Sequence, residues 1–173
     1  MRSTGIVRKI DKLGRIVIPK EIRNALRILD EDNLELFLDD DSIILKKFSF
    51  MKNMNGIAQN LLDSVQKTLN KNILVSDNNS IIAYVGSEKE KFINKKISKS
   101  IMEMMNLRTS LRNQSNLEIV DGLFYNVNYY LTPIVSNGNI IGSVMTFDKD
   151  VITDNDIRLV DIISNFFGKY MDN

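Results

Sequence analysis

The sequence has no cysteine and no histidine among its 173 residues. Their absence excludes disulfides, thiolate nucleophiles, imidazole bases and the usual ligands of zinc and haem. No run comes near eighteen apolar residues, and the chain opens on alternating polar and apolar positions, so we expect neither a membrane span nor a signal peptide. With 43% hydrophobic residues to build packed cores, the sequence predicts a globular, cytoplasmic protein that is not an enzyme and holds no metal or cofactor.

The net charge of +1 conceals two strongly charged segments. Residues 1–27 contain eight lysines and arginines against two acids, a local balance of +6, whereas residues 28–45 contain seven acids and no cation. We interpret the acidic segment as a solvated face. In the basic segment the arginines lie among apolar positions of strand type, which predicts an anion-binding surface, and a small basic unit without catalytic residues points to nucleic acid.

The first fifty residues predict a β-β-α-β-β unit. Strands at 5–11 and 15–19 are joined by a turn with a glycine, a helix follows at 20–26, and two further strands are expected at 34–38 and 43–47. So short a unit, without disulfide or metal, buries too little apolar surface to be stable alone. We therefore expect an interleaved dimer, which would also cover the open strand edges.

The rest of the chain mixes helix and strand patterns. Apolar residues recur at helical spacing in 48–72, namely Met51, Met54, Ala58, Leu61, Val65 and Leu69, and this seam fits either core packing or a contact between subunits. Beyond it we expect strands at 73–77, 81–85, 125–135 and 139–147, helices around 89–97 and 100–107, and a last helix capped at 153–156. This order predicts an α+β, sensor-like domain.

Residues 5–11 and the string Gly-Arg-Ile-Val-Ile-Pro-Lys-Glu-Ile-Arg at 14–23 resemble the DNA-binding domain of the AbrB-type transition-state regulators. The resemblance implies a swapped-hairpin barrel, β-dominated, in which two chains interleave. It is closest to the sporulation members of that family, whose chains continue into a GAF-type domain. We accordingly divide the chain into a swapped-hairpin DNA-binding domain at 1–50, a linking helix at 51–72 and a GAF-like sensory or oligomerisation domain at 73–173.

By this resemblance the DNA contacts fall on Arg8, Arg15 and Arg23, with Lys9 as an auxiliary contact. A further arginine common in the family is Asn24 here, which removes one phosphate or base contact. Guanidinium groups suit this role because they bridge phosphates and bind guanine edges. The alternative for each arginine is an ion pair with Asp11, Glu21 or the acidic segment, which would contribute little to stability.

The resemblance implies a sequence-selective regulator of sporulation genes that activates some and represses others. Its partners would be double-stranded DNA in AT-rich promoters and further copies of the chain, as a homodimer through the barrel and a homotetramer through the C-terminal domain, located at the forespore nucleoid. The alternative function is an antitoxin-like interaction protein built on the same barrel. Antitoxin tails are short and disordered until bound, whereas about 120 residues of folded pattern follow here.

A small ligand in the C-terminal domain is a separate question. Without cysteine or histidine, any ligand would be held non-covalently. Five aromatic residues could line a pocket there or simply pack in the core, as aromatic residues on strands usually do: Phe124, Tyr125, Tyr129, Tyr130 and Phe147.

Overall fold

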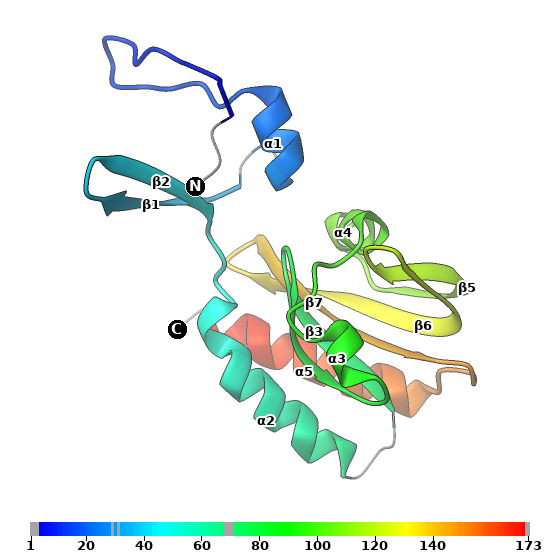
Figure 1. The fold of residues 1–173 in the computed structure, drawn as a ribbon. Coiled ribbons are helices and arrows are strands. Elements are labelled where there is room, and N and C mark those ends of the chain that lie inside the picture. Colours follow the sequence, from blue (N-terminus) through cyan, green and yellow to red (C-terminus); the bar gives the residue numbers. More distant parts are fainter. Residues whose placement is uncertain (1–3, 29, 31, 68–70, 172–173) are drawn as a thin grey trace. The chain divides into compact units, whose positions relative to one another are not determined.

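The computed structural model describes residues 4–28, 30, 32–67 and 71–171. The chain divides into two compact units, Met1–Phe48 and Ser49–Asn173 (Figure 1). Each unit has a sheet of its own, two strands in the first and five in the second. Among the described residues, no helix is both long and apolar enough to cross a membrane.

Among its described residues, the first unit contains the predicted helix and the second of the two predicted strand pairs. The helix α1, Lys20–Leu26, follows Pro19 and ends at Arg27, whose left-handed backbone (φ 54°) turns the chain away. Strands β1, Leu34–Asp39, and β2, Ser42–Lys47, pair in antiparallel register across a two-residue turn. Proline favours the first turn of a helix and a left-handed residue favours its end, so both helix boundaries follow from local chemistry.

The two strands expected before α1 are not formed in this chain. Residues 4–19 form a turn at 11–14 but no strand in this chain. Most of their apolar side chains are exposed, up to 85% for Val7 and 75% for Val17, whereas Ile18 is half-buried and Pro19 is buried. A β-strand requires a hydrogen-bonded neighbour, and in the single chain the segments 5–11 and 15–19 have no neighbouring strand among the described residues.

One face of the β1–β2 hairpin is also apolar and exposed. Leu36 lies opposite Leu45, and Leu38 lies opposite Ile43. Their exposed fractions are 67% and 36% for the first pair, and 84% and 65% for the second. Because side chains alternate between the two faces of a strand, these four residues form one continuous stripe, which we call the hairpin stripe.

The second unit is a five-stranded antiparallel sheet in the order β4-β3-β7-β6-β5. The strands are β3 Asn72–Asp77, β4 Ile81–Val85, β5 Leu111–Val120, β6 Leu123–Ser136 and β7 Asn139–Asp148. Strands β6 and β7 meet at Asn137 and Gly138, both with positive φ, 47° and 76°, which is the two-residue turn that an Asn-Gly sequence predicts.

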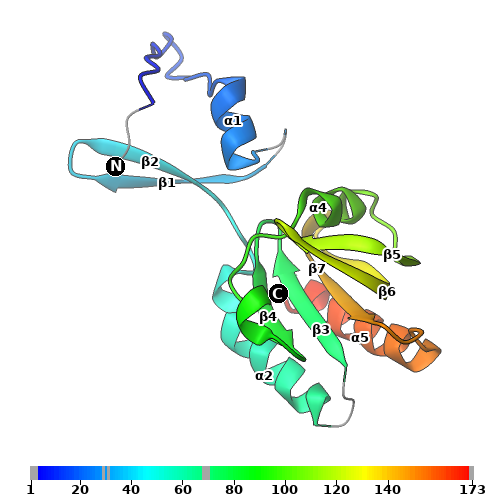
Figure 2. The same cartoon turned by 45° about the vertical axis from the view of Figure 1, so that its right-hand side comes forward.

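Helices cover both faces of this sheet. After a short 3-10 turn, η1 Lys52–Met54, helix α2, Asn55–Gln66, lies with α5, Asp154–Tyr170, along one face, and α3, Lys89–Phe92, with α4, Lys99–Asn106, packs on the other (Figures 1 and 2). Each face has its own buried cluster. Consecutive residues of β3 belong to different clusters. Ile73 and Val75 lie in the cluster beside α2 and α5, the α2–α5 core, and Leu74 lies in the cluster beside α3 and α4, the α3–α4 core.

Most elements expected in this unit are present, but one helix is shorter than expected and one strand is additional. Met51, Met54 and Ala58 are buried and Leu61 and Val65 pack against them, which supports core packing for this seam; Leu69 lies outside the described residues. Of the helices expected at 89–97 and 100–107, the first is shorter, at 89–92, and the second is present one residue earlier, at 99–106. Strand β5 was not expected, because the run Arg-Asn-Gln-Ser-Asn at 112–116 shows no apolar alternation at the sheet edge.

Candidate nucleic-acid interface

Asp11 organises the turn that joins residues 5–11 to residues 15–19, two extended segments that we call the N-terminal hairpin. Its Oδ1 accepts hydrogen bonds from the backbone N–H groups of Leu13 and Arg15, both at 2.9 Å, and its own N–H donates to the Arg15 carbonyl at 3.0 Å. Gly14 supplies the left-handed position of the turn, with φ of 76°. The N–H of Arg15, followed by its guanidinium, lowers the pKa of the Asp11 carboxyl below its usual value.

The same turn positions Arg15. Its Nε donates to Asp11 Oδ2 at 2.8 Å, while the side chain as a whole remains 72% exposed. Arg8 and Lys9 lie on the preceding arm of the hairpin and are exposed as well. One hairpin therefore carries three of the four cations expected to contact DNA, and all three face solvent in this chain.

Arg23, the fourth cation, lies on α1. Its Nη1 donates to Asp30 Oδ1 at 2.8 Å, with the Arg23 side chain 38% exposed and the Asp30 side chain 92% exposed. Arg15 and Arg23 therefore make the intramolecular ion pairs that the alternative interpretation anticipated. Such exposed pairs contribute roughly 0–1 kcal/mol, so a phosphate could replace either carboxylate at little cost. Asn24 is exposed beside Arg23.

The acidic segment is only partly the solvated face expected from the sequence. Asp39, Asp40 and Asp41 are exposed at the β1–β2 turn. Asp32, in contrast, pairs with Lys47 Nζ at 2.9 Å, and both side chains are about 15% exposed. The Lys47 ammonium also donates to the Arg27 carbonyl at 3.1 Å, so it joins the end of α1 to β2. The expectation of a solvated face was wrong at Asp32, because this side chain is mostly buried in an ion pair with Lys47.

The aromatic residues considered for a ligand pocket lie mostly in the cores. Tyr129, Tyr130 and Phe147 are 3–7% exposed, and Tyr125 and Phe147 pack at tilted angles in a ring cluster with Tyr84 and Phe92. Burial raises the pKa of the Tyr84 hydroxyl well above its usual value. Phe124 is 60% exposed. No three His, Cys, Asp or Glu side chains within the described ranges come together as a metal site.

Sequence reasoning missed two groups of residues. The turn-forming role of Asp11 had a signal, since an aspartate two residues before a turn N–H is a common turn former. A polar pocket on the second unit had no such signal: it is lined by Ser110, just before β5, and by residues of β6 and α5, which only the tertiary fold brings together.

Comparison with known proteins assigns both units. Residues 53–172 match the family model described as "Stage V sporulation protein T C-terminal, transcription factor", and residues 7–49 match the model of the bacterial antitoxin MazE. Among solved structures, the GAF domain of an Acinetobacter phosphoenolpyruvate-protein phosphotransferase superposes with a TM-score of 0.56 at 8% identity, covering 73% of this chain and 84% of that one. This similarity shows a GAF-like fold for the second unit.

Two curated relatives come from Bacillus subtilis strain 168. The transition state regulatory protein AbrB is 60% identical over 48 residues, which cover 28% of this chain and 50% of AbrB. Stage V sporulation protein T is 38% identical over 177 aligned residues, which cover 99% of both chains. With its first unit of AbrB type and its second of GAF type, this chain belongs to the stage V sporulation protein T family.

Proposed function

We propose that this protein is a DNA-binding transcription regulator of sporulation genes, acting as activator at some promoters and as repressor at others. The observation that carries this proposal is the exposed basic hairpin in a unit 60% identical to AbrB. Its location would be the cytoplasm of the forespore, at the nucleoid.

Arg8, Lys9, Arg15 and Arg23 are the proposed DNA contacts. The guanidinium of Arg15 is held by Asp11 through its Nε, while the side chain as a whole remains 72% exposed. Such a group bridges phosphates or binds a guanine edge in the major groove. A dimer would present four such cations from each chain. Binding to AT-rich duplex DNA would then depend mainly on phosphate contacts and on DNA shape.

A dimer of the first unit is the second part of the proposal. The hairpin stripe of Leu36, Leu38, Ile43 and Leu45 and the exposed apolar residues of the N-terminal hairpin both need a covering surface. In an interleaved dimer, residues 5–11 and 15–19 find their neighbouring strands in the partner chain. That arrangement buries apolar area and closes the strand edges at the same time.

The second unit would join two such dimers into a tetramer and respond to a small, non-covalently held ligand. Two DNA-binding dimers held in one assembly bind neighbouring sites with the high effective concentration of a bivalent molecule. A ligand that changes the second unit would then change the spacing of the dimers and so the affinity for DNA.

Fluorescence anisotropy of the full chain on a long AT-rich duplex, measured at several salt concentrations, tests DNA binding. Arg15→Ala should weaken binding and reduce the salt slope by about one for each phosphate that the variant no longer neutralises. The matched control is Lys95→Ala, which removes one exposed cation from the second unit and should leave the slope unchanged. Equal slopes for the wild type and Arg15→Ala would remove Arg15 from the interface.

The match of residues 7–49 to the MazE model favours a second candidate, an antitoxin-like protein that binds a protein through the same barrel. The 125 residues of the second unit argue against the short tail of such antitoxins. The same titration separates the two candidates, because absence of DNA binding even at low salt would reject the DNA-binding function and favour the antitoxin-like one.

A further inference from the structure

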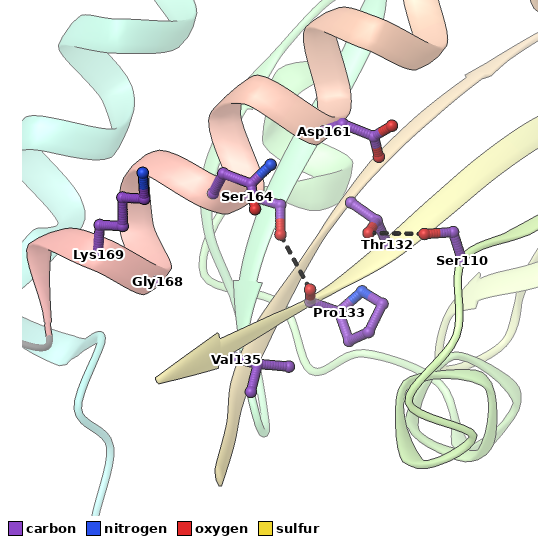
Figure 3. Close-up of a pocket in the computed structure, with 9 residues that line it drawn as sticks. Ser110, Thr132, Pro133, Val135, Asp161, Ser164, Gly168 and Lys169 are labelled. Atoms are coloured by element: carbon purple, nitrogen blue, oxygen red, sulfur yellow. Dashed lines mark hydrogen bonds between the residues drawn. The ribbon is translucent and has the colours of Figure 1, made fainter. Parts of the chain in front are cut away.

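A pocket of about 410 Å³ opens on the second unit between β6 and α5 (Figure 3). Strand β5 begins at Leu111, opposite Leu131, whereas β6 continues to Ser136. Residues 132–136 of β6 therefore extend past the end of β5, and α5 crosses beside them. The volume lies within the roughly 300–1,000 Å³ typical of small-molecule sites.

The walls of the pocket are fixed by the fold. Ser110 and Thr132 hydrogen-bond to each other at 2.9 Å across the strand ends, and the Ser164 hydroxyl donates to the Pro133 carbonyl at 2.9 Å. At Gly168 the helix comes so close to the strand that a Cβ would lie 2.6 Å from the Val135 carbonyl oxygen. The pocket is thus formed before any ligand binds, which limits the entropy cost of binding.

One carboxylate and one ammonium line this pocket. Asp161 accepts a hydrogen bond from the Tyr130 hydroxyl through Oδ1 at 2.8 Å, which leaves Oδ2 for a further donor. Burial raises the pKa of that tyrosine, so it remains protonated as a donor. Lys169 lies eight residues further along α5, about 12 Å by helix rise. Figure 3 shows Asp161 near Ser110 and Thr132, with Lys169 beyond Ser164 at the other end.

We propose that this pocket binds short zwitterionic peptides, with the peptide ammonium at Asp161 and its carboxylate at Lys169. An extended dipeptide spans about 7 Å. The two helix positions are about 12 Å apart, and the long side chain of Lys169 can cover the difference. The Ser164 hydroxyl lies between the charged ends, and its oxygen, which donates to the Pro133 carbonyl, can still accept a hydrogen bond from the peptide N–H. The inference deepens the proposed ligand response of the second unit and rests on that part of the proposed function alone.

Other ligand classes fit the lining less well. A nucleotide or phosphorylated metabolite carries two or more negative charges, and Asp161 would repel it while only Lys169 attracts it. A lipid or aromatic compound would have to displace water from hydroxyl and carboxylate groups that it cannot bond. A compound with one charge of each sign carries one charge opposite to that of Asp161 and one opposite to that of Lys169.

Isothermal titration calorimetry of the full chain with three probes tests the proposal. The probes are alanyl-alanine, its N-acetylated form without the ammonium, and its C-terminal amide without the carboxylate. Free alanyl-alanine should bind with a Kd on the order of 1 mM. Each capped form should bind roughly 3- to 10-fold more weakly, because it lacks one charge-assisted hydrogen bond.

Two variants assign the charged ends. Asp161→Asn keeps an acceptor for the Tyr130 hydroxyl. It should weaken the binding of free alanyl-alanine as much as acetylation of the peptide does, and it should not weaken the binding of the acetylated probe any further. Lys169→Gln should behave in the same way toward the amide. The matched controls are Glu90→Gln and Lys95→Gln, which remove exposed charges of the same unit outside the pocket.

Absence of measurable heat with free alanyl-alanine, or binding that neither variant weakens, overturns the proposal. These titrations contain no DNA, so their failure is distinct from failure of the DNA-binding function. Anisotropy of Asp161→Asn without peptide gives the reverse control, since a regulator that binds DNA through its first unit should keep its affinity in this variant.

Discussion

The two units differ in where their apolar side chains lie. In the second unit Leu62, Leu131 and Phe167 are fully buried, within cores on both faces of the sheet. Among the described residues of the first unit none belongs to either buried cluster, and Val7 and Leu38 are 85% and 84% exposed. A fully buried side chain of this size contributes roughly 1.5–3 kcal/mol, so a single chain secures that contribution in only one of its units.

The difference explains how one chain can combine a stable domain with a small basic one. The second unit reaches stability through its own long-range strand pairs, whereas the first has one helix, one hairpin and a few ion pairs. Stability of the first unit would then depend on protein concentration, as it does for obligate dimers. DNA binding and folding of that unit would be coupled to association.

The largest expected effect is that of Leu38→Asp in the hairpin stripe. In the single chain the substitution is harmless because the site is 84% exposed. In an interleaved dimer it buries an unpaired carboxylate twice, at about 3 kcal/mol per copy or roughly 6 kcal/mol per dimer. Light scattering of the full chain should show the molar mass fall by at least half, with loss of DNA binding.

A matched control is Val151→Asp, since Val151 is 66% exposed in a loop of the second unit. This variant should retain the molar mass and the DNA affinity of the wild type. An unchanged molar mass for Leu38→Asp would contradict the interleaved dimer and leave the hairpin stripe to another partner.

The next effect in size is that of Phe167→Ala in the α2–α5 core. Removing a fully buried phenylalanine should lower the free energy of unfolding of the second unit by about 3–5 kcal/mol. All five tyrosines lie in this unit and the chain has no tryptophan, so tyrosine fluorescence in urea follows it alone. Leu38→Asp should leave this transition in place, and a large shift there would show that the two units do not fold separately.

Sequence patterns predicted the elements whose signals are local. The Pro19 start of α1, the Asn137–Gly138 turn and the Thr153–Asp156 capping box are each decided within a few residues, and all three are present. Charge arithmetic also identified the exposed basic hairpin. The roles of Arg8, Lys9, Arg15 and Arg23 toward DNA stay a prediction.

Features that depend on distant contacts could not be predicted. The first half of strand β5 is polar, and the segment forms a strand because β6 pairs with it from Leu111 to Val120. The pocket lined by Asp161 and Lys169 exists because β5 stops short of β6. The strands expected at 5–11 and 15–19 show the converse case, where a strong local pattern has no neighbouring strand in a single chain.

The smallest effect concerns the Asp11 turn, which should not depend on association. Its hydrogen bonds span four residues, so the turn should persist in Leu38→Asp. Because the folded pKa of Asp11 is lowered, the carboxylate holds the turn above its unfolded pKa of about 3.9 and releases it as pH falls through the lower folded value. The amide resonances of Leu13 and Arg15 should therefore titrate below that value. In Gly14→Ala, where a side chain strains the left-handed position, the midpoint should rise; equal midpoints would mean that the turn does not set this pKa.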